Sequence, residues 1–205
     1  MTGIKNTYRF IRYALLQRHF YSLTAPLRVL PNFIVIGVGR GGTTSLYHYL
    51  NEHPCVIKSA YDELGFFDEN FHLGLNWYRS MFPTKFLKKK IAKEFGKCLT
   101  YDVTPSYIRK PWVARRIKEL FPKIKLIALL RNPVDKVYST YHSSIKSGVQ
   151  KPSFEEMVEE DIKTFQKFEN TNSIIDDEYF RNYIEKSQLG RGLYAQQLKI
   201  WFELF

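Results

Sequence analysis

The sequence has little cysteine and no long apolar run. Its 205 residues contain two cysteines, Cys55 and Cys98, and such a pair gives neither a disulfide framework nor a cluster of metal ligands. Two free thiols fit a reducing compartment, so we expect a cytoplasmic location. Charged residues interrupt even the stretch 8–30, so we expect neither a membrane span nor a cleavable signal peptide.

Histidines are also few, and they are not spaced as metal ligands are. The five histidines are scattered along the chain, whereas structural and catalytic zinc sites place their ligands at short, regular separations. We therefore expect no metal.

Negative charge is scarce over most of the chain. The formal net charge is +11 and the sequence pI is near 9.5. Residues 151–185 alone hold four basic and ten acidic side chains, so the excess positive charge lies elsewhere. Such a balance predicts an anionic partner, and charge alone leaves nucleotide, acidic polysaccharide, nucleic acid and membrane surface open.

Residues 1–31 mix arginines with large apolar side chains. This composition is compatible with a basic amphipathic helix in peripheral contact with anionic membrane through residues 1–30. A terminal helix that packs on the domain or frays is the simpler interpretation, and we favour it. We take 1–31 as an N-terminal segment and 32–205 as one α/β domain.

The stretch 33–47 organises the chain. An apolar β-branched run leads into a glycine-rich turn, and two threonines then open a helical pattern. Backbone N–H groups and the helix dipole point at an anion in this layout. The spacing from Gly37 to Gly42 matches a phosphate-binding P-loop, except that Thr43 replaces the lysine and the loop's cation is Arg40.

Further apolar segments alternate with helical stretches. We expect strands at 33–36, 56–57, 97–101 and 125–130, the last being the clearest buried strand, and helices at 44–51, 75–81, 112–121 and 134–147. The alternation predicts a P-loop-like three-layer α/β fold with a central parallel sheet flanked by helices. Ligands bind at the carboxyl ends of such strands, so the loop 37–44, the turn 58–67 and the corner at Arg131 should gather there.

The sequence also lacks the acid that a nucleoside triphosphatase uses to hold Mg²⁺. Arg131 follows the 125–130 strand, where that acid would stand. An arginine there favours direct binding of phosphate. The residues alone therefore suggest that the protein has two anion-binding sites, one at the loop and one at Arg131, for a nucleotide that carries no metal.

These motifs together resemble the sulfotransferase family, nearest the heparan sulfate N- and 3-O-sulfotransferase branch. The loop resembles the family's 5′-phosphosulfate loop, and 131–139 its 3′-phosphate motif. The remaining segments that resemble that branch are 63–67, 74–78, 104–107 and 191–194. Any one of these motifs alone is weak evidence for the family, whereas all of them in this order are specific. Together they cover about residues 32–205.

The resemblance implies transfer of a sulfuryl group from 3′-phosphoadenosine 5′-phosphosulfate to a hydroxyl or amine, on a saccharide or glycoconjugate. Glu63 would be the general base, and Arg40 would stabilise the charge on the leaving oxygen. Arg131 and Ser139 would bind the 3′-phosphate. The residues that would hold the 5′-phosphate are Arg40, Gly41, Gly42, Thr43, Thr44 and Ser45. No nucleic acid partner is expected.

The sequence departs from the heparan-type pattern at three places. Arg40 and Val103 stand where that branch has lysines, and the chain lacks the family's C-terminal strand and loop after Phe205. Two other function classes stay open. One is a catalytically impaired nucleotide- or polyanion-binding module, and the less favoured one is a P-loop kinase.

Overall fold

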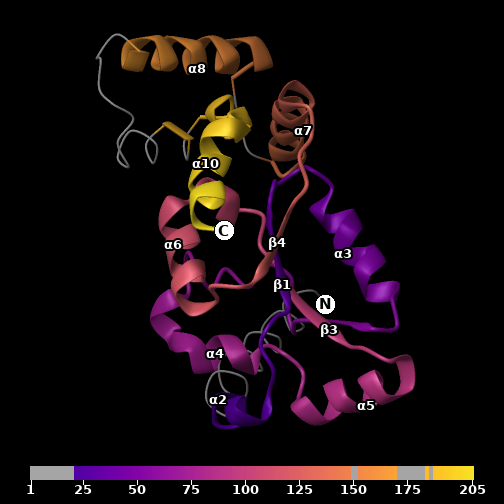
Figure 1. Ribbon diagram of the computed structural model, residues 1–205. Coiled ribbons are helices and arrows are strands. Elements are labelled where there is room, and N and C mark those ends of the chain that lie inside the picture. The colour runs from indigo at the N-terminus through magenta and orange to yellow at the C-terminus, as the bar shows by residue number, and fades with distance from the viewer. Residues whose placement is uncertain (1–20, 149–151, 170–182, 185–186) are drawn as a thin grey trace. The chain divides into compact units, whose positions relative to one another are not determined.

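The computed structural model describes residues 21–148, 152–169, 183–184 and 187–205 (Figure 1). The predicted N-terminal segment therefore lies outside the described residues as far as residue 20. Contacts divide the chain into two compact units. The first comprises the described parts of Met1–Ile36, Thr44–Thr104 and Ile124–Ile127, and the second those of Gly37–Thr43, Pro105–Lys123 and Ala128–Phe205.

A four-stranded sheet with the order β2-β3-β1-β4 forms the centre of the fold. Its strands are β1 (Phe33–Gly37), β2 (Val56–Lys58), β3 (Leu99–Val103) and β4 (Lys125–Ala128). β1 and β2 both pair parallel with β3. Every residue of β1 is buried, as its run of aromatic and β-branched side chains predicts. The expected α/β fold with a parallel sheet flanked by helices is confirmed.

β4 corrects the prediction of a clearly buried strand at 125–130. The strand ends at Ala128 and lies at the edge of the sheet, and three of its four residues are exposed. The side chain of Ile127 is 38% exposed. Apolar composition does not reveal how many neighbours a strand has, which is why the pattern misled.

β3 runs further than the predicted strand at 97–101. It includes Asp102, whose carboxylate is fully buried and accepts a hydrogen bond from the hydroxyl of Tyr78 over 3.0 Å. A buried carboxylate inside a strand is uncommon without such a partner, and the predicted strand ended before Asp102.

Aromatic side chains pack against one another in the first unit. The rings of Phe66 and Tyr78 stack with centroids 4.3 Å apart. Thr84 caps α5 by accepting a hydrogen bond from the N–H of Leu87, and Gly96 ends that helix with a φ of 80°. The helical elements of this unit are α2 (Tyr21–Leu23), η2 (Ala25–Leu27), α3 (Thr43–Glu52), η3 (Phe71–Leu73), α4 (Gly74–Ser80) and α5 (Lys85–Phe95).

The second unit is helical. Asn132 caps α7 through the N–H of Val134, with Pro133 in the first turn. The indole N–H of Trp201 donates to the carbonyl of Ile108 over 2.8 Å, which fixes α10 to η4. Its elements are η4 (Tyr107–Arg109), α6 (Pro111–Leu120), α7 (Pro133–Lys146), α8 (Phe154–Glu169), η5 (Gly190–Gly192) and α10 (Tyr194–Leu204).

Candidate functional site

The glycine-rich loop follows β1 and leads into α3. Its backbone is tied to the chain after β4, because the N–H of Val38 donates to the carbonyl of Leu129 and the N–H of Leu129 donates to the carbonyl of Gly37. A Cβ atom on Gly41 would lie 2.7 Å from the Leu129 carbonyl oxygen. The loop therefore needs glycine at this position for a close approach of two backbone segments.

Arg40 joins the loop to α7. Its Nε donates to the hydroxyl oxygen of Ser139 over 3.2 Å. Its carbonyl oxygen lies 3.5 Å from Nη1 of Arg131, at the outer limit of a hydrogen bond. Within the second unit the structure thus brings together three residues that the sequence assigned to nucleotide binding.

The other predicted loop residues differ in exposure. Gly42 is exposed with a φ of 100°, and Thr43 is 5% exposed. Thr44 and Ser45 are exposed in the first turn of α3, where backbone N–H groups lack partners within the helix. The turn presents the N–H donors that an anion needs, while the hydroxyl of Thr43 occupies a buried position rather than replacing the lysine's charge.

Glu63 lies in the first unit, next to the carboxyl end of β3. Its N–H donates to the carbonyl of Val103 over 3.1 Å, and Val103 pairs with Val35 of β1. Glu63 is exposed as a whole residue, yet partial burial raises the pKa of its carboxyl group, followed by repulsion from Asp62 and Asp68.

Arg40 and Glu63 share an unusual backbone conformation. Of the non-glycine residues that the structure describes, these two alone have positive φ, at 64° and 53°. Left-handed backbone is unfavourable for most side chains, and such strain gathers at functional sites. Both residues that the sequence predicts as catalytic therefore carry this independent mark.

A buried hydrogen-bond network holds the turn that carries Glu63. The hydroxyl of Thr104 donates to Asp102 over 3.0 Å, and the N–H of Gly65 donates to Thr104 over 3.4 Å. Tyr78 donates to the other oxygen of Asp102. Sequence reasoning placed 104–107 in a family motif but missed Asp102 as the anchor.

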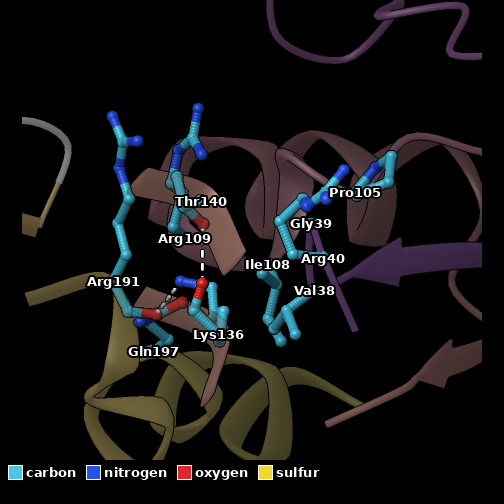
Figure 2. A pocket seen from close by; sticks show the side chains of 10 residues that line it. All are labelled: Val38, Gly39, Arg40, Pro105, Ile108, Arg109, Lys136, Thr140, Arg191 and Gln197. Atoms are coloured by element: carbon cyan, nitrogen blue, oxygen red, sulfur yellow. Dashed lines mark hydrogen bonds between the residues drawn. The ribbon is translucent and has the colours of Figure 1, made fainter. Parts of the chain in front are cut away.

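A cavity of about 110 Å³, open to solvent, lies in the second unit (Figure 2). Four of its lining residues are cationic. Only one of these, Arg40, belongs to the predicted site, and Ser139 and Arg131 do not line it. The lining residues are Val38, Gly39, Arg40, Pro105, Ile108, Arg109, Lys136, Thr140, Arg191 and Gln197.

Lys136 is the most enclosed of these cations. It is 6% exposed, and its Nζ donates to the carbonyl of Arg191 over 2.8 Å. Burial, followed by repulsion from Arg191 and Arg109, lowers the pKa of Lys136 to about 8. Sequence reasoning missed Lys136, although its place five residues after Arg131 in the 131–139 motif offered a signal.

Two absences hold for the part of the chain that the structure describes. It contains no group of three or more His, Cys, Asp or Glu side chains that could hold a metal ion. It also contains no helix with the length and apolar character needed to cross a membrane.

Comparison with known proteins identifies the family of the chain. The family model described as a sulfotransferase domain matches residues 30–205. The chain belongs to the sulfotransferase family. A solved sulfotransferase structure from Alicyclobacillus acidocaldarius superposes with a TM-score of 0.57 at 23% identity, covering 86% of this chain and 70% of that one. The P-loop-like sulfotransferase fold is thereby confirmed.

Curated relatives point to the predicted branch of sulfotransferases. Heparan sulfate glucosamine 3-O-sulfotransferase 3B1 of Mus musculus is 34% identical over 86% of this chain and 39% of its own length. The membrane-associated sulfotransferase kil1 of Dictyostelium discoideum is 36% identical over 68% of this chain and 30% of its own length. The chain thus spans well under half the length of these relatives. The resemblance to the heparan sulfate branch is confirmed.

Proposed function

We propose that the chain transfers a sulfuryl group from 3′-phosphoadenosine 5′-phosphosulfate to a hydroxyl or amine of a saccharide. The observation that carries the proposal is the contact of Arg40 with both Ser139 and Arg131. A loop of the 5′-phosphate type and a motif of the 3′-phosphate type meet at Arg40, through its guanidinium to Ser139 and through its backbone carbonyl to Arg131. Membership of the sulfotransferase family supports the same chemistry.

The residues present fit such a nucleotide. Gly41 allows the loop backbone to lie close to the Leu129 carbonyl, and the first turn of α3 offers N–H donors for the 5′-phosphate. Arg131 and Ser139 would hold the 3′-phosphate, since a guanidinium and a hydroxyl both donate to phosphate oxygens. The bound nucleotide supplies the sulfuryl group itself.

The proposed transfer is an in-line displacement at sulfur. The acceptor oxygen or nitrogen forms a bond to sulfur as the bond from sulfur to the 5′-phosphate oxygen breaks. Glu63 takes the proton from the acceptor as a general base. Arg40 stabilises the negative charge that develops on the departing oxygen, and arginine does this by charge and hydrogen bonding rather than by giving up a proton.

A saccharide acceptor is favoured by the names of the relatives and by charge. The most similar relatives include enzymes named for heparan sulfate glucosamine. The formal charge of +11 suits an acidic glycan. The acceptor class is accordingly part of the proposal, while the sugar and the position that receives the sulfuryl group are left to experiment.

The test is a radiolabelled sulfate transfer assay over a panel of glycans, with thermal stabilisation by adenosine 3′,5′-bisphosphate measured alongside. Transfer to at least one glycan, abolished in Glu63→Gln, is the expected result. Stabilisation without transfer to any acceptor would favour the nucleotide-binding module instead. Mg²⁺-dependent hydrolysis of ATP would favour the kinase class, and absence of any nucleotide stabilisation would refute nucleotide binding.

A further inference from the structure

Helix α5 carries an unusual combination of side chains for a surface helix of the first unit. None of its eleven residues is buried, and it holds five lysines against one glutamate. A surface helix normally turns its large apolar side chains toward the core, yet the side chain of Phe86 is 78% exposed. Strong positive charge and an exposed aromatic ring therefore occur on the same short helix.

Phe86 stands in the middle of the lysine-bearing face of α5. It precedes Lys89 and Lys90 by three and four positions, and residues at these spacings are neighbours on a helix surface. Lys93 lies one turn beyond Lys89, and all three lysines are exposed. Like charges four positions apart repel one another, so an anionic partner on this face would remove a cost to the helix.

The opposite face attaches α5 to the rest of the unit. Lys88 is half-buried, and its Nζ donates to Oδ1 of Asn32 over 2.7 Å. Ile91 and Ala92 are half-buried on the same side of the helix. The helix is therefore held in a fixed orientation, with one lysine used for attachment and the other four exposed.

Exposed leucines lie close to the start of α5. Arg28 and Thr84 form an isolated antiparallel bridge, and Nη1 of Arg28 donates to the carbonyl of Phe82 over 2.7 Å. These contacts fix the end of η2 beside the first turn of α5, and Figure 1 shows α2 and α5 at the same end of the first unit. Leu27 is 65% exposed and Leu23 is 79% exposed. Apolar side chains from two segments thus accompany the lysines.

We propose that the outward face of α5, with Leu23 and Leu27 beside it, docks on the surface of an anionic phospholipid bilayer. The lysine ammonium groups meet the anionic headgroups, while Phe86 and the leucines enter the boundary between headgroups and acyl chains. Lysine stems are apolar, so they can follow the ring while their charged ends stay at headgroup level. A soluble polyanion would use the lysines alone and leave the ring of Phe86 in water, which is why the bilayer fits this face better.

This surface lies at the opposite end of β3 from the candidate base. α5 leads through Gly96 toward the amino end of β3, whereas the carbonyl of Val103, at the carboxyl end, accepts a hydrogen bond from the N–H of Glu63. A bilayer on α5 would therefore leave the turn that carries Glu63 uncovered. The inference goes beyond the proposed sulfuryl transfer, and it assigns membrane contact to a helix outside residues 1–30.

The first test is co-sedimentation of the full chain with lipid vesicles. Mixed vesicles of phosphatidylcholine and phosphatidylserine should bind the chain, whereas vesicles of phosphatidylcholine alone should not, and added sodium chloride should weaken the binding. Phe86→Ala should weaken it at least about tenfold through loss of apolar burial. Lys89→Gln should weaken it roughly fivefold through loss of one charge near the anionic surface.

Two matched variants control for exposure and charge. Phe202→Ala removes a phenylalanine of α10 that is 81% exposed, and Lys146→Gln removes an exposed lysine of α7. Both should leave binding to the mixed vesicles unchanged. Thermal melting checks that each variant folds.

The second test follows the side chain at position 86 directly. Phe86→Trp places a fluorophore on the lysine face, and its emission, taken as the difference from the wild-type spectrum, should shift to shorter wavelength on mixed vesicles. Brominated acyl chains should quench that emission. Soluble heparin, which offers negative charge without an apolar phase, should produce neither effect.

Three results would overturn the proposal. The first is absence of binding to the mixed vesicles, and the second is equal binding to phosphatidylcholine alone. The third is binding that Phe86→Ala leaves intact, because another part of the chain would then make the contact. A Phe86→Trp side chain that stays in water on vesicles, in a chain that heparin displaces, would give α5 to a soluble polyanion instead. Failure of sulfuryl transfer in the glycan assay would not bear on any of these readouts.

Discussion

Nε of Arg40 donates to the hydroxyl oxygen of Ser139 over 3.2 Å, although the two residues lie 99 positions apart in the chain. One belongs to the glycine-rich loop and the other to the second turn of α7. The contact places the loop's cation beside the motif that the sequence assigned to the 3′-phosphate. Two segments that the sequence predicts to bind anions are thus joined through the side chain of Arg40.

The first prediction concerns Arg131. Arg131→Ala should weaken binding of adenosine 3′,5′-bisphosphate by about 2 kcal/mol, which is roughly 30-fold in Kd, through loss of a charge-assisted contact. Calorimetric titration measures the change. Lys146→Ala removes a charge from the last turn of α7 and serves as the matched control. Equal affinity in Arg131→Ala and wild type would remove Arg131 from the nucleotide site.

The second prediction concerns Glu63. Glu63→Gln should lower kcat by roughly 10² to 10⁴, because an amide cannot accept the acceptor's proton. Glu69→Gln changes an exposed acid a short distance along the chain and should leave kcat near the wild-type value. A Glu63→Gln variant with wild-type kcat would show that another group accepts the proton.

The pH profile tests the environment of Glu63. Partial burial and then repulsion from Asp62 and Asp68 raise the pKa of its carboxyl group. The base form exists above that pKa, so kcat/KM should fall as pH drops through it, at a higher pH than an ordinary glutamate would give. Asp62→Asn removes one source of repulsion, and its acid limb should shift to lower pH. A limb that stays in place would show that Asp62 does not act on the catalytic base.

The third prediction separates two glycines of the same loop. Gly41→Ala would bring a Cβ within 2.7 Å of the Leu129 carbonyl oxygen, whereas a Cβ at Gly39 meets nothing within 4 Å. Overpacking against backbone costs about 1 to 3 kcal/mol, so Gly41→Ala should lower stability in urea and weaken nucleotide binding. Gly39→Ala should do neither. Similar losses in both variants would argue against a specific close approach at Gly41.

The sequence predicted the local structure correctly where a short motif determines the backbone geometry. The loop around Arg40 and the turn into α7 at Arg131 are short motifs whose glycine, proline and cap residues dictate backbone geometry. It failed where the outcome depends on neighbours distant in sequence. The exposure of Ile127 follows from the edge position of β4, and no local pattern encodes strand order.

Local sequence patterns also could not predict which residues line the cavity. Lys136 and Arg109 are ordinary helix and turn cations in the sequence, and only the packing of η4, η5 and α7 places both on one cavity. The lowered pKa of Lys136 depends on burial and then on repulsion from Arg191 and Arg109, which are properties of the folded chain. Asp102 is an example in the first unit. Its carboxylate lies buried in a strand because it accepts hydrogen bonds from Tyr78 and Thr104, and the sequence pattern does not show these contacts.

The fourth prediction concerns the dependence of stability on pH through Lys136. Its pKa falls from 10.5 to about 8 on folding, so between these values the unfolded chain holds a proton that the folded chain has released. Stability from this group therefore rises with pH above about 8, by up to roughly 1.4 kcal/mol per pH unit. Urea unfolding in chloride buffer between pH 8 and 9.5 measures the slope, and Lys136→Met should lack this contribution. A wild-type slope equal to that of Lys136→Met would show that Lys136 keeps its proton on folding.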